Sequence, residues 1–110
     1  MTNSREKGKR YERHVASLFR GEGYNARRGQ QYCGIDGDDV VGVPYIHIEA
    51  KAREKGHGEL YDWIAQSKRD AKAGEIPIVI HKKNHCNDLV TMEFTDWIKL
   101  YREWEAGHEA

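Results

Sequence analysis

The chain has 110 residues, enough for one domain with an ordinary hydrophobic core. Its 18 basic and 18 acidic side chains give a formal net charge of zero, which by itself argues against a general phosphate-binding surface. No apolar run approaches the ~20 residues of a membrane span, the N-terminus has no signal-peptide core, and two cysteines are too few for a disulfide scaffold. We therefore expect a single cytoplasmic domain over residues 1–110, with no membrane partner.

The charges are arranged in blocks that cancel. Residues 1–30 carry a net charge of +5, residues 31–50 carry −4, residues 51–84 carry +3 and residues 85–110 carry −4. The second block contains acids and no base, and it includes Asp36, Asp38 and Asp39 within four positions. A purely acidic segment between basic ones suits a cation site beside a polyanion, whereas a solvated surface is the alternative interpretation.

The hydrophobic pattern predicts a mixed α/β domain. In chain order we expect a helix over 4–21, a short strand over 24–28, a strand start over 39–43, a strand over 45–52, a helix from 60 that ends by Gly74, strands over 76–81 and 89–92, and a helix over 95–105. Thr95 is the expected N-cap of the last helix. The helix faces that carry Trp63, Trp97 and Trp104 are expected to lie in the core or, in part, in a dimer interface.

The strand over 45–52 carries the residues with the clearest chemical potential. Because strand residues alternate between faces, Glu49 and Lys51 point to the same side, and Asp39 can reach that point from the neighbouring hairpin strand. Two carboxylates and the backbone carbonyl of Ala50 suit Mg²⁺ or Mn²⁺, and a lysine beside them can hold or deprotonate an attacking water. A surface cross-strand ion pair is the alternative for the Glu-x-Lys tripeptide taken alone.

The string from Asp39 to Lys51, with its Asp-Val start, Gly/Pro turn and apolar-Glu-x-Lys strand, resembles the core of the PD-(D/E)xK nucleases. It is most similar to the small archaeal-type Holliday junction resolvases and their phage relatives. The resemblance implies a restriction-endonuclease-like mixed β-sheet flanked by α-helices. Asp38 stands where the family motif has proline, so the metal ligand is either Asp38 or Asp39, and we take Asp39 because it directly precedes the two valines.

The resemblance also implies roles for individual residues. Asp39 and Glu49 match the metal-binding carboxylates and Lys51 matches the catalytic lysine, while Glu12 and Gln66 match residues near the site. The loop with Arg28, Gln31 and Gly34 is similar to a DNA-contacting loop of the family. For direct phosphate contact, the basic pairs adjoining strands are the candidates: Arg27, Arg28, Lys82 and Lys83.

The resulting hypothesis is an Mg²⁺-dependent DNA endonuclease, with Mn²⁺ able to substitute and no small-molecule cofactor. The resemblance implies four-way junctions as substrate and possible phage origin, and symmetric cutting would require a C₂ homodimer. The apolar side of the last helix and the second strand–helix segment are the alternatives for its interface. A nicking, homing or restriction-type nuclease remains open, as does an inactive DNA-binding module.

Overall fold

The elements follow one another in the predicted order. The computed structural model describes residues 4–29, 39–54 and 58–108. The helices and strands are α1 (Ser4–Gly21), β1 (Arg27–Arg28), β2 (Val40–Val41), β3 (Ile46–Arg53), α2 (Leu60–Asp70), β4 (Ile76–Lys83), β5 (Leu89–Met92) and α3 (Phe94–His108). The expected first strand is shorter than predicted, because only its last two residues pair with β2.

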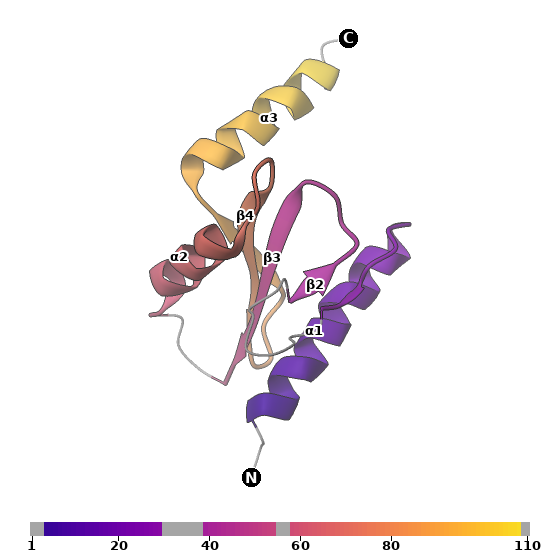
Figure 1. The fold of residues 1–110 in the computed structure, drawn as a ribbon, viewed down its shortest axis with the longest axis vertical. Helices are drawn as coiled ribbons and strands as arrows, with labels where there is room; N and C mark the ends of the chain where they lie inside the picture. Colours follow the sequence, from indigo (N-terminus) through magenta and orange to yellow (C-terminus); the bar gives the residue numbers. More distant parts are fainter. Residues whose placement is uncertain (1–3, 30–38, 55–57, 109–110) are drawn as a thin grey trace.

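The five strands form one mixed sheet in the order β1-β2-β3-β4-β5 (Figure 1). The central pair β3–β4 is parallel and is connected through α2, whereas the other neighbouring pairs are antiparallel. Parallel strands need a crossover of this kind, and antiparallel strands can be joined by short turns. The predicted restriction-endonuclease-like α/β class, a mixed sheet flanked by helices, is confirmed.

Helix α1 covers one face of the sheet. Tyr11, Val15 and Ala16 are buried against the apolar side chains of β3 and β4 on that face, which are Ile48, Ala50, Ile78 and Ile80. The spacing of the helix residues places them on one stripe, and the strand residues alternate with a period of two. This packing fixes the position of α1 over the centre of the sheet.

Helix α2 covers the opposite face, where the buried side chains are partly polar. Trp63 and Ile64 pack on Val79, so the predicted core position of Trp63 is confirmed. The interface of α2 with the sheet contains four buried polar or charged residues: His47, Glu49 and His81 from the strands and Ser67 from α2. The Ser67 hydroxyl donates to the Ile78 carbonyl at 3.1 Å. Buried polar groups in such number need partners, so this face is where a functional site is expected.

A tight turn aligns β2 with β3. Gly42 has φ +94°, and a Cβ at this position would collide with the backbone carbonyl of Asn25. Tyr45, at the end of the turn, also has a left-handed φ of 70°. The turn pairs Val40 with Ile48, which brings the residue before β2, Asp39, beside the middle of β3. The Asp39 N–H donates to the Ile48 carbonyl at 3.1 Å.

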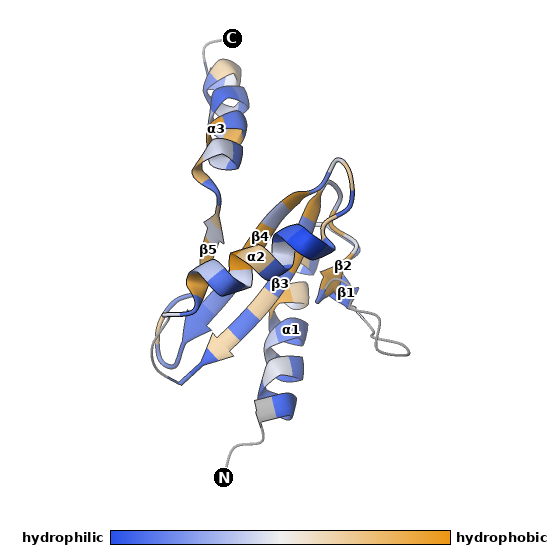
Figure 2. Ribbon diagram, turned by 60° about the vertical axis from the view of Figure 1, so that its left-hand side comes forward, coloured by the Kyte–Doolittle hydropathy of each residue, from blue (hydrophilic) through white to orange (hydrophobic). Residues whose placement is uncertain are grey.

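Helix α3 differs from the prediction in two ways. It begins at Phe94, with the Glu93 carbonyl accepting the Asp96 and Trp97 amides, so Thr95 is not its N-cap. None of its residues is buried, and it extends away from the sheet (Figure 2). The prediction that Trp97 and Trp104 lie in the core of this chain is therefore wrong, because the helix leaves the sheet after a single residue. In the described part of the chain, no helix has the length and apolar character needed to cross a bilayer.

Candidate active site

The β2–β3 hairpin sets Asp39 against the strand that carries Glu49 and Lys51. The Ala50 amide donates to Asp39 Oδ2 at 2.8 Å, which turns the carboxylate towards β3. Glu49 lies one residue away and is 1% exposed, while Lys51 is half-buried two residues further along. The hairpin pairing predicted from the sequence is confirmed, and it joins the three residues of the Asp…Glu-x-Lys pattern in space.

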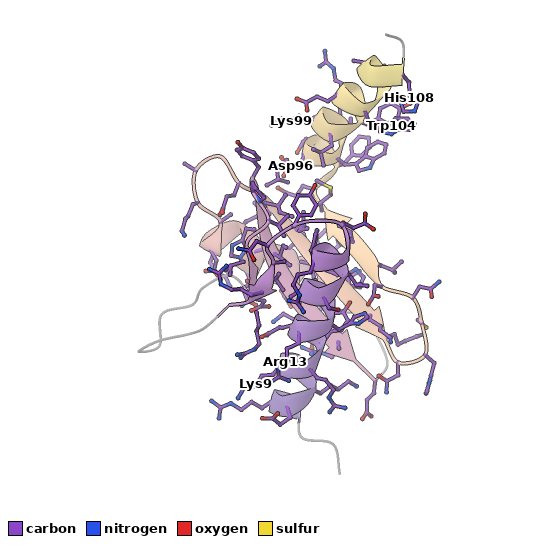
Figure 3. The ribbon with its side chains drawn as sticks, turned by 90° about the vertical axis from the view of Figure 1, so that its right-hand side faces the viewer. Lys9, Arg13, Asp96, Lys99, Trp104 and His108 are labelled. Carbon is purple, nitrogen blue, oxygen red and sulfur yellow. The ribbon has the colours of Figure 1, made fainter. Side chains whose placement is uncertain are left out.

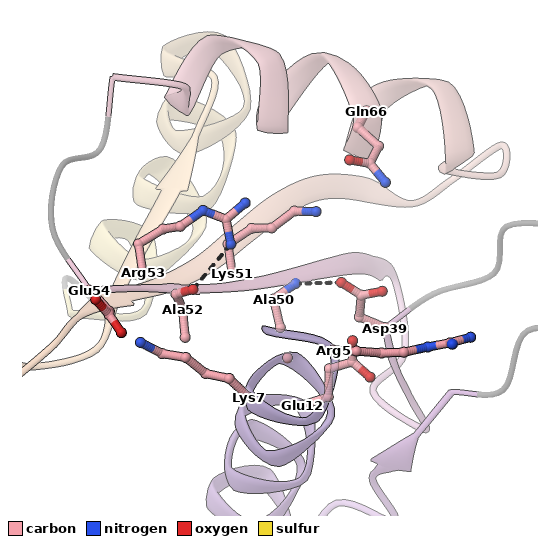
Figure 4. Close-up of a pocket in the computed structure, with 11 residues that line it drawn as sticks. Arg5, Lys7, Glu12, Asp39, Ala50, Lys51, Ala52, Arg53, Glu54 and Gln66 are labelled. Carbon is pink, nitrogen blue, oxygen red and sulfur yellow. Dashed lines mark hydrogen bonds between the residues drawn. The ribbon is translucent and has the colours of Figure 1, made fainter. Parts of the chain in front are cut away.

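A cavity of about 570 Å³ opens beside this strand (Figure 4). Four of the five predicted catalytic residues line it: Glu12 from α1, Asp39 before β2, Lys51 from β3 and Gln66 from α2. Glu49 does not line the cavity, since its side chain is buried on the α2 face of β3. The remaining lining residues are Arg5, Lys7, Gly8, Ala50, Ala52, Arg53 and Glu54.

Negative charge is concentrated at the inner end of the cavity. Burial, together with the neighbouring carboxylates of Glu49 and Glu12, raises the pKa of Asp39 from 3.8 to about 8, against the lowering effect of the Ala50 amide. Burial also raises the pKa of Glu12, although Arg28 opposes this. Carboxylates arranged in this way resist simultaneous ionisation, and a cation placed among them would relieve the repulsion.

Arg28 is held by Glu12. Its Nε donates to Glu12 Oε1 at 2.8 Å, and the pair is mostly shielded from solvent. The contact joins α1 to β1 and orients the Glu12 carboxylate at the cavity. Contact between Arg28 and DNA stays a prediction, and in this arrangement the guanidinium already has a carboxylate partner.

Glu49 also belongs to a second group of possible metal ligands. His47 Nε2 lies 3.1 Å from Glu49 Oε1, and one ligand atom from each of His47, Glu49 and Asp70 lies within 4.8 Å of the other two. Glu49 Oε2 and Asp70 Oδ2 are buried atoms that have no hydrogen-bond partner among the described residues. Hard carboxylate oxygens with one imidazole nitrogen fit a divalent cation, so this group of three residues, which does not line the cavity, can hold one.

The described residues among the predicted DNA-binding set lie on β1 and β4. Arg27 is exposed on β1, and Lys83 is exposed at the end of β4. Lys82 lines a smaller cavity of about 200 Å³ together with Lys7 and Arg10 of α1. Gln31 lies outside the described residues, as do Asp38 and Gly34, so the choice between Asp38 and Asp39 rests on the position of Asp39 alone.

The sequence interpretation missed three residues of α1 that line the cavity, namely Arg5, Lys7 and Gly8. Arg5 and Gly8 precede Glu12 by seven and four positions, which places all three on one helix face. A Cβ at Gly8 would meet nothing within 4 Å, so this turn leaves the cavity open. Helical spacing counted back from Glu12 could have identified Arg5 and Gly8.

A mixed sheet between α1 and α2, with an Asp held by a hairpin beside a strand Glu-x-Lys, is the arrangement of the PD-(D/E)xK class of nucleases. The model of one family in this class, the phage putative PDDEXK endonucleases, matches residues 3–109. The chain belongs to that family and is therefore an endonuclease, a hydrolase, by membership. No curated protein and no solved structure gave a significant match to the chain.

Proposed function

We propose that this protein is a DNA endonuclease that requires a divalent cation, Mg²⁺ in the first place, with Mn²⁺ able to replace it. The observation that carries the proposal is that Asp39 and Lys51 line one cavity, with Glu49 buried between them in sequence on β3, in a chain of an endonuclease family. The raised pKa of Asp39 supports it, because burial and the neighbouring carboxylates oppose ionisation of Asp39 and a bound cation would favour it.

Asp39, Glu49 and the Ala50 carbonyl would hold the cation. When bound, it supplies positive charge to the scissile phosphate and lowers the pKa of water. Lys51, whose side chain enters the cavity between β3 and Gln66, holds the attacking water and the departing proton (Figure 4). Glu12 and Gln66 flank this water from α1 and α2. The products of the proposed hydrolysis are a 5′-phosphate and a 3′-hydroxyl.

The DNA backbone would approach over the basic residues around this acidic centre. Arg5, Lys7 and Arg53 line the cavity mouth with Lys51, and Arg10 and Lys82 continue the positive surface into the adjoining cavity. Arg27 and Lys83 extend it in the proposal, and Gln31, which lies outside the described residues, is proposed as a further DNA contact. Phosphate contacts of this kind supply affinity without sequence specificity, which suits an enzyme that recognises the shape of its substrate.

The proposed substrate is the four-way DNA junction. A junction has two symmetry-related strands to be cut, and one chain contributes one cavity of this composition, so resolution requires a homodimer. The alternatives are a nicking or sequence-specific nuclease of the same fold and an inactive DNA-binding module. The phage family match is consistent with a phage-encoded enzyme.

The test compares cleavage of a mobile four-way junction with cleavage of linear duplexes made from the same arm sequences, in Mg²⁺ and in EDTA. The proposal predicts cation-dependent cleavage that favours the junction, and its loss in Lys51→Ala. Preference for a linear duplex would replace the junction proposal by the nicking or sequence-specific alternative. Binding without cleavage in either Mg²⁺ or Mn²⁺ would indicate the inactive module.

A further inference from the structure

Helix α3 displays a continuous row of aromatic side chains. Phe94, Trp97, Tyr101 and Trp104, here called the aromatic stripe, recur at intervals of three and four residues and therefore share one side of the helix. Neighbouring ring centroids in the stripe lie 5.2 to 6.1 Å apart. The four residues are 69%, 46%, 41% and 60% exposed. Figure 3 shows Trp104 on a different side of α3 from Asp96 and Lys99. An amphipathic helix with its whole apolar side exposed needs a covering surface.

The described part of the same chain does not cover the stripe. Glu93 is the one residue between the end of β5 and the start of α3. Its carbonyl accepts the first helical amides, and its carboxylate lies 3.2 Å from Lys68 Nζ on α2. These contacts fix the direction in which α3 leaves the sheet, away from α1 and the other strands (Figures 1 and 2). With this one-residue connection and these contacts at its first turn, α3 points away from its own domain.

The described residues also form an apolar groove that no other described element covers. It lies between α1 and β5, has a volume of about 270 Å³ and is lined mainly by apolar side chains, which are Val15, Leu18, Phe19, Ile80, Leu89 and Val90. Leu18, Leu89 and Val90 are 48%, 58% and 59% exposed. Exposed leucine and valine side chains gathered at a groove mark an interaction surface.

We propose that the occupant of this groove is α3 of a second copy of the chain, and that the exchange is reciprocal. At ~200 Å² for a whole aromatic side chain, the exposed fractions leave on the order of 400 Å² of the aromatic stripe to be covered on each helix. Two stripes and the two surfaces covering them would bury roughly 1,600 Å², the size of a standard stable interface. Exchange of an identical C-terminal helix produces a closed C₂ dimer.

This interface would serve the proposed function, because a C₂ dimer presents two cavities related by symmetry, as junction cutting requires. The structural argument rests on α3 and the groove and does not involve the cavity residues. Association and cleavage can therefore be measured separately. A monomer that cleaves DNA would overturn the dimer and leave the nuclease proposal in place. A dimer that does not cleave DNA would support the dimer and overturn the nuclease proposal.

The experiment measures the mass of the full chain by size-exclusion chromatography with light scattering over a range of micromolar concentrations. We expect a dimer for the wild type. The dimer dissociation constant should rise at least about 30-fold in Trp104→Asp on the stripe and in Leu18→Asp in the groove. The matched control is Ala106→Asp, which adds the same charge seven residues from Lys99, on the side away from Trp104. It should remain dimeric. Far-UV circular dichroism checks that each variant is folded.

Mixing the two monomeric variants distinguishes the proposed exchange from pairing of two α3 helices. Trp104→Asp retains an intact groove and Leu18→Asp retains an intact helix, so the mixture should form a heterodimer through one unaltered helix–groove contact. A wild-type monomer at every concentration would overturn the inference. A Leu18→Asp chain that stays dimeric while Trp104→Asp dissociates would overturn it as well, because the stripe would then be covered by something other than the groove.

Discussion

Replacing Asp39 by asparagine should stabilise the protein at high pH while removing its cation response. The asparagine Oδ1 can still accept the Ala50 amide, which now donates to Asp39 at 2.8 Å, so the hairpin keeps this contact. What the substitution removes is one buried carboxylate beside Glu49 and Glu12. Few active-site substitutions are expected to raise stability, so the direction of the effect is informative.

The direction in which stability changes with pH follows from the raised pKa of Asp39. Since the pKa of Asp39 rises from 3.8 to about 8 in the folded protein, the stability that its protonated form contributes is complete below pH 3.8 and is lost as the pH rises to 8. The whole shift corresponds to about 6 kcal/mol. Water entering the open cavity and adjustment of Glu12 reduce what a variant recovers, so we expect Asp39→Asn to gain about 1–3 kcal/mol over the wild type at pH 9 and much less at pH 5.

The assay is urea unfolding in EDTA at pH 5 and pH 9, followed by melting temperatures with and without Mg²⁺ or Mn²⁺. The wild type should gain stability from the cation and Asp39→Asn should gain little. Asp62→Asn, an exposed carboxylate on α2, is the control and should change neither result. An Asp39→Asn protein that is less stable than the wild type at pH 9 would refute the account of a repulsive carboxylate cluster.

Three further predictions concern the hairpin, the buried histidine and the acidic pair. Gly42→Ala should lower the free energy of unfolding by about 2–4 kcal/mol because of its positive φ and its contact with Asn25, whereas Gly21→Ala should change it by less than about 1 kcal/mol. His47→Gln should weaken Mn²⁺ binding about 10–100-fold in calorimetry, because His47 orients Glu49, and unchanged affinity would exclude that role. Asp38→Asn should retain most of the cleavage activity and Asp39→Asn should lose it, and the reverse result would move the proposed ligand by one residue.

Much of the fold could be predicted because it depends on local patterns. Alternation in 45–52 and the Gly/Pro turn were sufficient to place Asp39 beside Glu49, and helical spacing was sufficient to place Trp63 in the core. The same spacing failed for α3. It shows that a helix has an apolar side, but whether that side is covered depends on where the chain goes after β5.

The sequence predicts which residues belong to the candidate site, but it does not predict their burial or their contacts with distant residues. Periodicity places Glu49 on the same face as Lys51, but the depth of Glu49 beneath α2, its contact with His47 and the proximity of Asp70 arise from tertiary packing. Likewise, the pairing of Arg28 with Glu12 depends on how α1 crosses β1. Such contacts join residues far apart in the sequence, and composition alone carries no signal for them.

The central claim is that Asp39, Glu49 and Lys51 form a cation-dependent centre that hydrolyses DNA. The most direct measurement is cleavage of a labelled four-way junction by the wild type and by Lys51→Ala, each in Mg²⁺ and in EDTA, with Lys72→Ala as an exposed-lysine control. The account predicts Mg²⁺-dependent cleavage by the wild type and the control, and a loss of about 100-fold or more in Lys51→Ala with DNA binding retained. Equal cleavage by Lys51→Ala, or cleavage that persists in EDTA, would contradict it.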